Sequence, residues 1–90
     1  METITVNAAR VYKVGLLLIE TLHTPEGWVA GVCGLPGCVT QAETHEELLL
    51  NIVDAYKGIE SVYEQEGEPI PWTADYQHWD GKGTLEWATL

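Results

Sequence analysis

The sequence has few positive charges, only two cysteines, no phenylalanine and no long apolar run. Four Lys and Arg residues stand against 14 Asp and Glu residues, which gives a net charge of −10. A chain with this charge repels phosphate at long range, which argues against direct binding to nucleic acid or to an anionic membrane. The charge fits a soluble protein with a cationic partner, although a solvated acidic surface is the more common explanation.

The chain also lacks targeting and disulfide signals. The longest apolar run, Val14–Ile19, is far too short to span a bilayer. The first ten residues carry Glu2 and Arg10 and no apolar signal-peptide core, so we expect a cytoplasmic protein. Cys33 and Cys38 form neither a CxxC redox pair nor half of a zinc site with a visible second half. We expect both to be reduced, with Cys33 a small buried hydrophobe.

What the sequence does contain is typical of one small folded domain over residues 1–90. Its 46% of hydrophobic residues include four Trp and four Tyr. Apolar and β-branched runs predict strands, and a stripe at three- and four-residue spacing predicts a helix. Residues 1–10 are ambiguous between a short edge strand and an ordered arm. The expected elements are strands at 11–22, 28–33 and 38–42, a helix at about 45–66, a Trp-rich loop at 69–83 and a last strand at 84–90.

These elements predict an α+β fold in the order β-β-β-α-β. The short loops, including an expected loop at residues 23–27, favour a three-stranded antiparallel meander, to which the last strand is added. One long helix packs on one face of the sheet. Because the first two strands are apolar on both sides, the second face should form an interface. We therefore expect a homo-oligomer or a partner bound through the sheet, with the Trp-rich segment packed back on the fold.

The helix carries clear start and stop signals. Thr44 and Glu47 form a capping box, in which the Thr44 hydroxyl bonds the amide of Glu47 and the Glu47 carboxylate bonds the amide of Thr44. Gly67 is the expected stop, and Gly58 is expected to allow a close contact. The predicted apolar stripe consists of Leu48, Ile52, Ala55, Tyr56, Ile59, Val62 and Tyr63.

No pattern in the sequence supports a cofactor, a metal site or catalysis. His23, His45 and His78 lack the spacing of metal ligands. A ribonuclease-H-type nuclease needs carboxylates that converge on two metal ions. Glu20, Glu46 or Glu47, and Glu86 lie on suitable elements. However, Glu20 is at the far end of its strand, and the cap explains Glu47, so we expect no enzyme.

Three motifs, in order and with this spacing, resemble those of the HicB-like antitoxin family. They are the turn Leu35-Pro36-Gly37-Cys38, the cap Thr44-His45-Glu46-Glu47, and the segment Gly67-Glu68-Pro69-Ile70-Pro71. The resemblance runs from Trp28 to Trp72, and the strand at Tyr12–Glu20 fits the family's first strand. It implies a partial ribonuclease-H-like fold without the nuclease active site.

The resemblance also implies a function, that of the antitoxin in a two-component system. Such a protein binds and blocks a small basic RNA-cleaving toxin of the HicA-like kind. Family members usually carry a C-terminal DNA-binding domain, and this sequence ends at Leu90 without one. The alternatives are a stand-alone oligomeric domain of undefined role and, third, a metal-dependent nuclease. Acidic residues available to a basic partner, with no assignment of which make contact, are Glu20, Glu26, Glu43, Glu46, Glu60 and Glu86.

Overall fold

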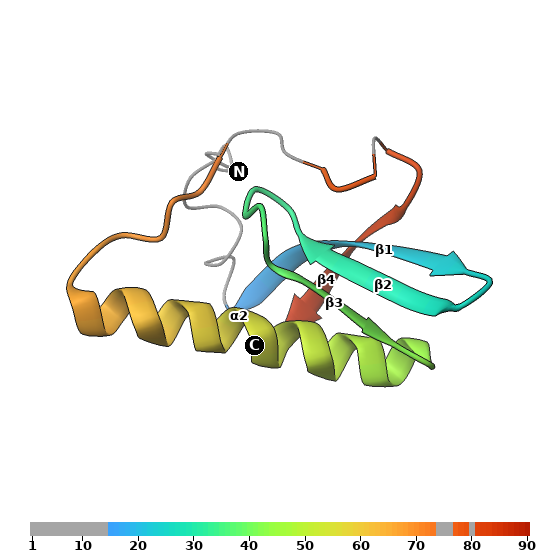
Figure 1. Ribbon diagram of the computed structural model, residues 1–90, viewed down its shortest axis with the longest axis horizontal. Coiled ribbons are helices and arrows are strands. Elements are labelled where there is room, and N and C mark those ends of the chain that lie inside the picture. The colour runs from blue at the N-terminus through green and yellow to red at the C-terminus, as the bar shows by residue number, and fades with distance from the viewer. Residues whose placement is uncertain (1–14, 74–76, 80) are drawn as a thin grey trace.

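The computed structural model describes residues 15–73, 77–79 and 81–90. Its elements are β1 (Leu16–Thr24), β2 (Gly27–Val32), β3 (Val39–Ala42), α2 (His45–Glu66) and β4 (Thr84–Thr89). The strands form one antiparallel sheet in the order β3-β2-β1-β4, and α2 lies on one face of it (Figure 1). The predicted α+β class and β-β-β-α-β order are confirmed. The expectations for residues 1–10 and for a strand over 11–14 lie outside the described residues.

The hairpin between β1 and β2 is tighter than predicted. The expected loop at residues 23–27 is wrong, because β1 continues to Thr24 and β2 begins at Gly27. The two strands pair up to this point, with Thr24 opposite Gly27. The Thr24 hydroxyl donates to the Gly27 carbonyl at 2.9 Å and accepts from the Glu26 amide at 3.2 Å. These bonds close the chain over Pro25 and Glu26 alone.

The core lies between the sheet and α2. Successive side chains of a strand point to opposite faces, so alternate residues of each strand face the helix. Leu17 and Ile19 of β1 are fully buried there, opposite Ala88 and Glu86 of β4. The buried cluster comprises Leu17, Ile19, Ala30, Val32, Leu35, Cys38, Leu48, Ile52, Tyr56 and Ala88.

Both ends of α2 are capped at the predicted residues. The amide of Glu47 donates to the Thr44 hydroxyl at 3.1 Å, as the capping box requires. The Glu47 carboxylate accepts from the amide of Glu43 at 3.3 Å, one residue earlier than we expected. Gly67 ends the helix in the left-handed conformation, with φ at 69°, where a residue without Cβ costs little.

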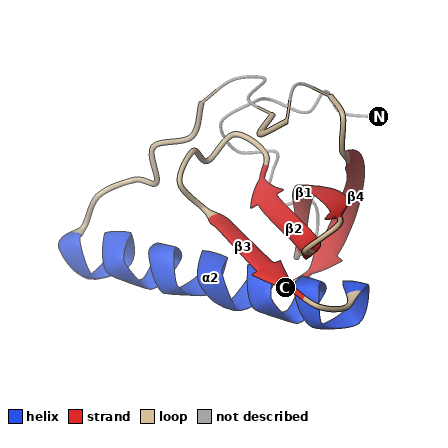
Figure 2. Cartoon of the chain, turned by 45° about the vertical axis from the view of Figure 1, so that its right-hand side comes forward, coloured by secondary structure: helices blue, strands red, loops and turns tan. Residues whose placement is uncertain are grey.

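The predicted apolar stripe is buried only along the first part of the helix. Leu48, Ile52 and Tyr56 are buried, but Val62 is 52% exposed and its predicted burial is wrong. The reason is visible in Figures 1 and 2, where the C-terminal turns of α2 extend beyond the edge of the sheet. Gly58 also makes no close contact with another element, since no described atom outside its own helical turns lies within 4 Å of where its Cβ would be.

Candidate functional site

The sheet face away from α2, called here the helix-free face, is the first candidate for a binding surface. The alternation of the strands places on this face those residues that do not point at the helix. They are Leu16, Leu18, Glu20 and Leu22 of β1, Val29 and Gly31 of β2, Val39 and Gln41 of β3, and Leu85, Trp87 and Thr89 of β4.

The centre of the helix-free face is closed by the chain itself. The carboxylate of Glu20, which is fully buried, accepts the amides of His78 at 2.7 Å and Trp79 at 3.2 Å on one oxygen. The other oxygen accepts the amide of Gly83 at 3.0 Å. The predicted packing of the Trp-rich segment onto the fold is confirmed for these residues. The prediction that Glu20 is available to a partner is wrong, because its carboxylate is enclosed and three backbone donors occupy it.

The His78 ring lies directly over Gly31. Its Nε2 atom is 2.8 Å from the Val32 carbonyl oxygen. A Cβ on Gly31 would come within 2.3–2.5 Å of three atoms of this ring, so the position requires a glycine. The ring therefore occupies the space that a side chain of β2 would otherwise fill.

Apolar groups remain exposed at the two edges of this face. Val39 on β3 is 47% exposed, and Leu85 and Trp87 on β4 are 49% and 39% exposed. The side chains of the central strands between them are buried or half-buried. We expected the whole second face to be open, and the structure leaves only its edges open, because His78, Trp79 and Gly83 lie over Glu20 and Gly31 in the middle.

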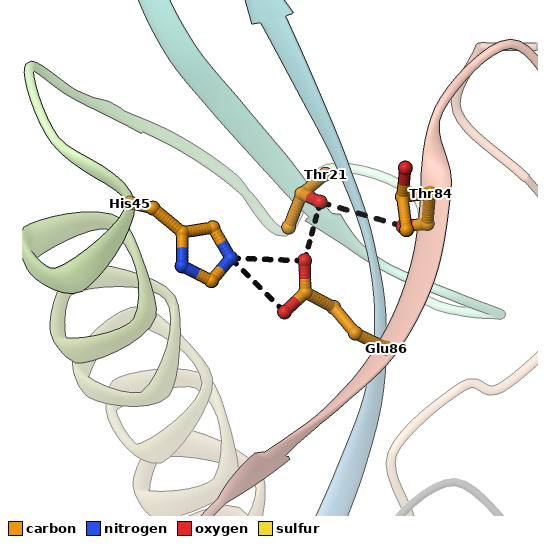
Figure 3. A network of polar contacts seen from close by, with 4 residues as sticks. All are labelled: Thr21, His45, Thr84 and Glu86. Carbon is orange, nitrogen blue, oxygen red and sulfur yellow. Dashed lines mark hydrogen bonds and ion pairs between the residues drawn. The ribbon is translucent and has the colours of Figure 1, made fainter.

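A second candidate site lies on the other face, where α2 begins (Figure 3). The His45 Nε2 atom is 3.0 Å from both carboxylate oxygens of Glu86. The Thr21 hydroxyl donates to Glu86 Oε2 at 2.6 Å and also lies 3.4 Å from the Thr84 carbonyl oxygen. The network joins the first residue of the helix to the two strands β1 and β4.

Burial and hydrogen bonding act in opposite directions on Glu86. Partial burial raises the pKa of its carboxyl, while the hydrogen bonds from Thr21 and His45 and the charge of His45 lower it. The lowering effects prevail, so the pKa of Glu86 lies below its usual value. Glu86 is held by its own chain and is only partly exposed, which limits the role predicted for it as a partner contact.

Two further rings extend this network to the hairpin. The His23 ring stacks on Trp28 with centroids 4.5 Å apart, and His45 meets Trp28 edge-on at 5.1 Å. Sequence reasoning missed this cluster. A two-residue turn after Thr24 would have revealed part of it, since that register places His23 directly opposite Trp28.

A groove of about 540 Å³ lies beside the cluster, at the end of the sheet where the β1–β2 turn and the start of α2 meet. Three carboxylates line it, from Glu26, Glu43 and Glu47, and Trp28 forms part of its wall. The other lining residues are Thr24, Gly27, Val29, Gln41, Ala42 and Asn51.

The motif residues of the resemblance do not form one site. Leu35 and Cys38 turn into the core, where both are buried, and Pro36 and Gly37 are exposed at the tip of the turn. Thr44 and Glu47 lie beyond the other end of β3 and cap the helix. The structure gives both motifs a structural role in the packing of the turn and the helix.

The carboxylates considered for a nuclease are also dispersed. Glu20 lies on the helix-free face and Glu86 on the helix face, and Glu47 bonds the chain just before α2. Within residues 15–73, 77–79 and 81–90, no group of three or more His, Cys, Asp or Glu side chains is arranged to hold a metal ion.

Both cysteines are buried and lie outside any disulfide. Cys38 belongs to the core cluster, and its burial raises the pKa of the thiol to about 11. Cys33 is 3% exposed, in agreement with its prediction as a buried residue.

Comparison with known proteins finds no matching family model, curated protein or solved structure. In the part of the chain that is described, no helix has both the length and the apolarity needed to cross a membrane.

The contact of His78 with Gly31 can be tested by Gly31→Ala. We expect a loss of about 1–3 kcal/mol in the free energy of unfolding, because the added methyl group displaces the ring. In the double variant Gly31→Ala/His78→Ala the added cost should largely disappear. Gly58→Ala is the matched control, since its methyl group meets open space and should stabilise the helix by about 1 kcal/mol. Equal effects of the two glycine substitutions in urea denaturation would contradict the contact.

The Glu86 network predicts a pH-dependent stability. A carboxyl whose pKa is lower in the folded state stabilises the fold above its unfolded pKa, and this contribution is lost as the pH falls through the folded pKa. Glu86→Gln should therefore cost about 1–2 kcal/mol at pH 7 and progressively less below about pH 4.3. Urea denaturation at several pH values measures this, with Glu64→Gln at an exposed position as the control. A cost that does not change with pH would count against the network.

The buried thiol of Cys38 predicts low reactivity. With a pKa of about 11, roughly one thiol in a thousand is ionised at pH 8, and the side chain is also shielded from reagent. Iodoacetamide should alkylate it slowly in the native chain and rapidly in urea. Rapid native labelling of Cys38, located by peptide mass spectrometry, would contradict this burial.

Proposed function

We propose that the chain is a protein-binding module of the HicB-like type that neutralises a small basic RNA-cleaving toxin by occlusion. The observation that carries the proposal is the exposure of Val39, Leu85 and Trp87 at the edges of one sheet face, in a chain of net charge −10. Large apolar groups on a solvent-exposed sheet are typical of protein interfaces. The HicB-like motifs described above add the class of partner.

The charge supports a basic partner in particular. Four of the acidic residues considered for such a contact, Glu26, Glu43, Glu46 and Glu60, are exposed. A ribonuclease holds RNA on a basic surface, and an acidic protein is steered towards such a surface at long range. Once bound there, the module excludes RNA by its volume, so it needs no catalytic group of its own.

In the proposed complex, the apolar side chains at the edges of the sheet make the short-range contacts. Surface charges accelerate encounter but contribute modestly to the final free energy of binding, whereas buried aromatic and aliphatic side chains contribute most of it. Leu85 and Trp87 are neighbours on one face of β4, and they offer such a contact. A complex of this kind acts where RNA is present, so the proposal includes a cytoplasmic location.

The alternative is a stand-alone oligomeric domain. Its supporting observation is that β4, the outer strand of the sheet among the described residues, carries exposed apolar side chains. A nuclease has less support, because Glu20 and Glu86 point to opposite faces of the sheet and each is bonded within the fold.

The test is a reconstituted inhibition assay. The reading frames on either side of the gene are searched for a short basic product, and the cleavage of RNA by that purified product is measured with increasing amounts of this chain. We expect stoichiometric inhibition and co-purification of the two proteins. Leu85→Lys should weaken inhibition at least ~10-fold, because it places a charge within the apolar contact and repels a basic partner.

The control is Leu50→Lys, which introduces the same charge at a residue that is 73% exposed on α2. It should leave inhibition nearly unchanged. Unimpaired RNA cleavage in the presence of excess wild-type chain would overturn the antitoxin function. An equal loss with both variants would show that charge alone, and not the helix-free face, governs binding.

A further inference from the structure

Three backbone amides converge on one carboxylate at the centre of the helix-free face. One oxygen of Glu20 accepts the amides of His78 at 2.7 Å and Trp79 at 3.2 Å, and the other accepts the amide of Gly83 at 3.0 Å. Concave groups of backbone N–H donors are typical anion-binding sites in proteins. Here the anion belongs to the chain itself, because β1 carries the carboxylate and the donors precede β4.

Two glycines allow the donors to come so close to Glu20. A Cβ on Gly83 would lie 2.6 Å from the Thr21 carbonyl oxygen and 2.6 Å from Cγ of Glu20, so only a glycine brings its amide to the carboxylate. Gly31 lies directly opposite Glu20 in the β1–β2 register, and the His78 ring fills the space of its missing side chain. The residue types on both sides of the carboxylate therefore suit the closed arrangement.

These contacts are separate from those that hold the sheet and the helix together. The β1–β4 register ends at the pair of Thr21 and Thr84, so the three donors lie outside the strands. The buried core cluster lies on the opposite face, between the sheet and α2. Loss of the bonds to Glu20 would leave both the strand ladders and this core in place. The three donors can therefore detach in a local opening, without unfolding of the whole domain.

We propose that the Glu20 carboxylate and the amides of His78, Trp79 and Gly83 form an anion-dependent clasp that closes the centre of the helix-free face. With a negative charge in the Glu20 position, the three amides are bound and the His78 ring lies on Gly31. Without this charge, three donors have no acceptor, and they turn to water instead. The clasp then opens while the sheet and α2 keep their arrangement.

The clasp controls how much apolar surface this face presents. Leu18 and Leu22 lie on either side of Glu20 on the same face of β1, and both are half-buried. Opening should expose more of these two side chains and extend the apolar surface inwards from Leu85, which lies opposite Glu20 on β4. The closed clasp would thus confine a partner to the edges of the sheet. This consequence for binding rests on the proposed function, whereas the clasp itself does not.

The first experiment removes the anion and then supplies it from solution. Glu20→Ala deletes Cγ, the carboxyl carbon and both oxygens, and acetate contains the same set of atoms. In residue-resolved hydrogen exchange, the amides of His78, Trp79 and Gly83 should approach the rates of an unstructured chain within ~10-fold, while the β1–β2 ladder keeps at least ~100-fold protection. Acetate should restore protection of the three amides at least ~10-fold and saturably. Sodium chloride at equal ionic strength should not.

Glu20→Gln is the matched variant. Its side chain has the size of the native one but no charge, and its NH2 group cannot accept a hydrogen bond. The clasp should therefore open, and acetate should have no effect because the side chain still fills the site. This variant also keeps the test decisive if Glu20→Ala does not fold. Glu64→Gln, at an exposed position of α2, is the surface control and should leave the three amides protected as in the wild type.

The second experiment measures the apolar surface that the clasp covers. A fluorescent dye that binds exposed apolar surface is added to the wild type and to both Glu20 variants. We expect at least ~3-fold more dye fluorescence from Glu20→Ala and Glu20→Gln than from the wild type, since opening exposes apolar side chains on the sheet. Acetate should reverse the increase for Glu20→Ala alone. Far-ultraviolet circular dichroism should stay unchanged, because the strands and α2 persist.

Selective loss of protection at the three amides, reversed by acetate only in Glu20→Ala, supports the clasp. Continued protection of these amides in both variants would show that Glu20 does not hold them. Loss of the ladder protection at the same time would show that the clasp does not open separately from the fold. An equal effect of chloride and acetate would overturn the anion site. All these measurements use the chain alone, so their result is independent of whether the chain inhibits a toxin.

Discussion

A buried carboxylate determines how the second half of the chain is attached to the first. Glu20 is fully enclosed on β1, and a charge in such a place is tolerated only when hydrogen bonds replace its lost water. The three donors come from His78, Trp79 and Gly83, which lie 58–63 residues further along the chain. Their amides converge on Glu20 only if the segment before β4 crosses the helix-free face. The charge therefore positions both this segment and the start of β4.

This attachment explains why the sheet is covered unequally. The segment that Glu20 holds places His78 over Gly31 and shields the two central strands. The side chains of Val39, Leu85 and Trp87, on the two outer strands of the described sheet, remain partly exposed. On the opposite face, α2 covers β3 and β2 more fully than β4, and the link from His45 to Glu86 connects the helix to that distant strand. Exposed apolar side chains therefore remain on β4, which α2 covers less than it covers β2 and β3.

Signals between residues close in the sequence made much of the fold predictable, whereas contacts between residues far apart in the sequence could not be predicted. The bounds of α2 followed from Thr44 and Gly67, since caps act within a few residues. The apolar strands correctly indicated that both faces of β1 lose water, but the sequence could not show which segment covers the second face. Glu20 was indistinguishable from a surface carboxylate, because its donors are backbone amides that leave no trace in residue type. The link between His45 and Glu86 joins two side chains but spans 41 residues, and no local signal in the sequence pairs residues so far apart.

In an acidic chain, the charges that attract a partner at long range are different groups from those that contact it at short range. Its carboxylates repel a second copy and attract a basic partner, so charge alone would favour the basic partner at every approach. Hydrogen bonds made by backbone N–H and C=O groups do not depend on the net charge of the chain. These groups point along the plane of the sheet. The side chains of Leu85 and Trp87 point out of that plane. Charge would therefore bring a basic partner near the chain, and the exposed side chains of Leu85 and Trp87 are the groups that the proposed complex would bury.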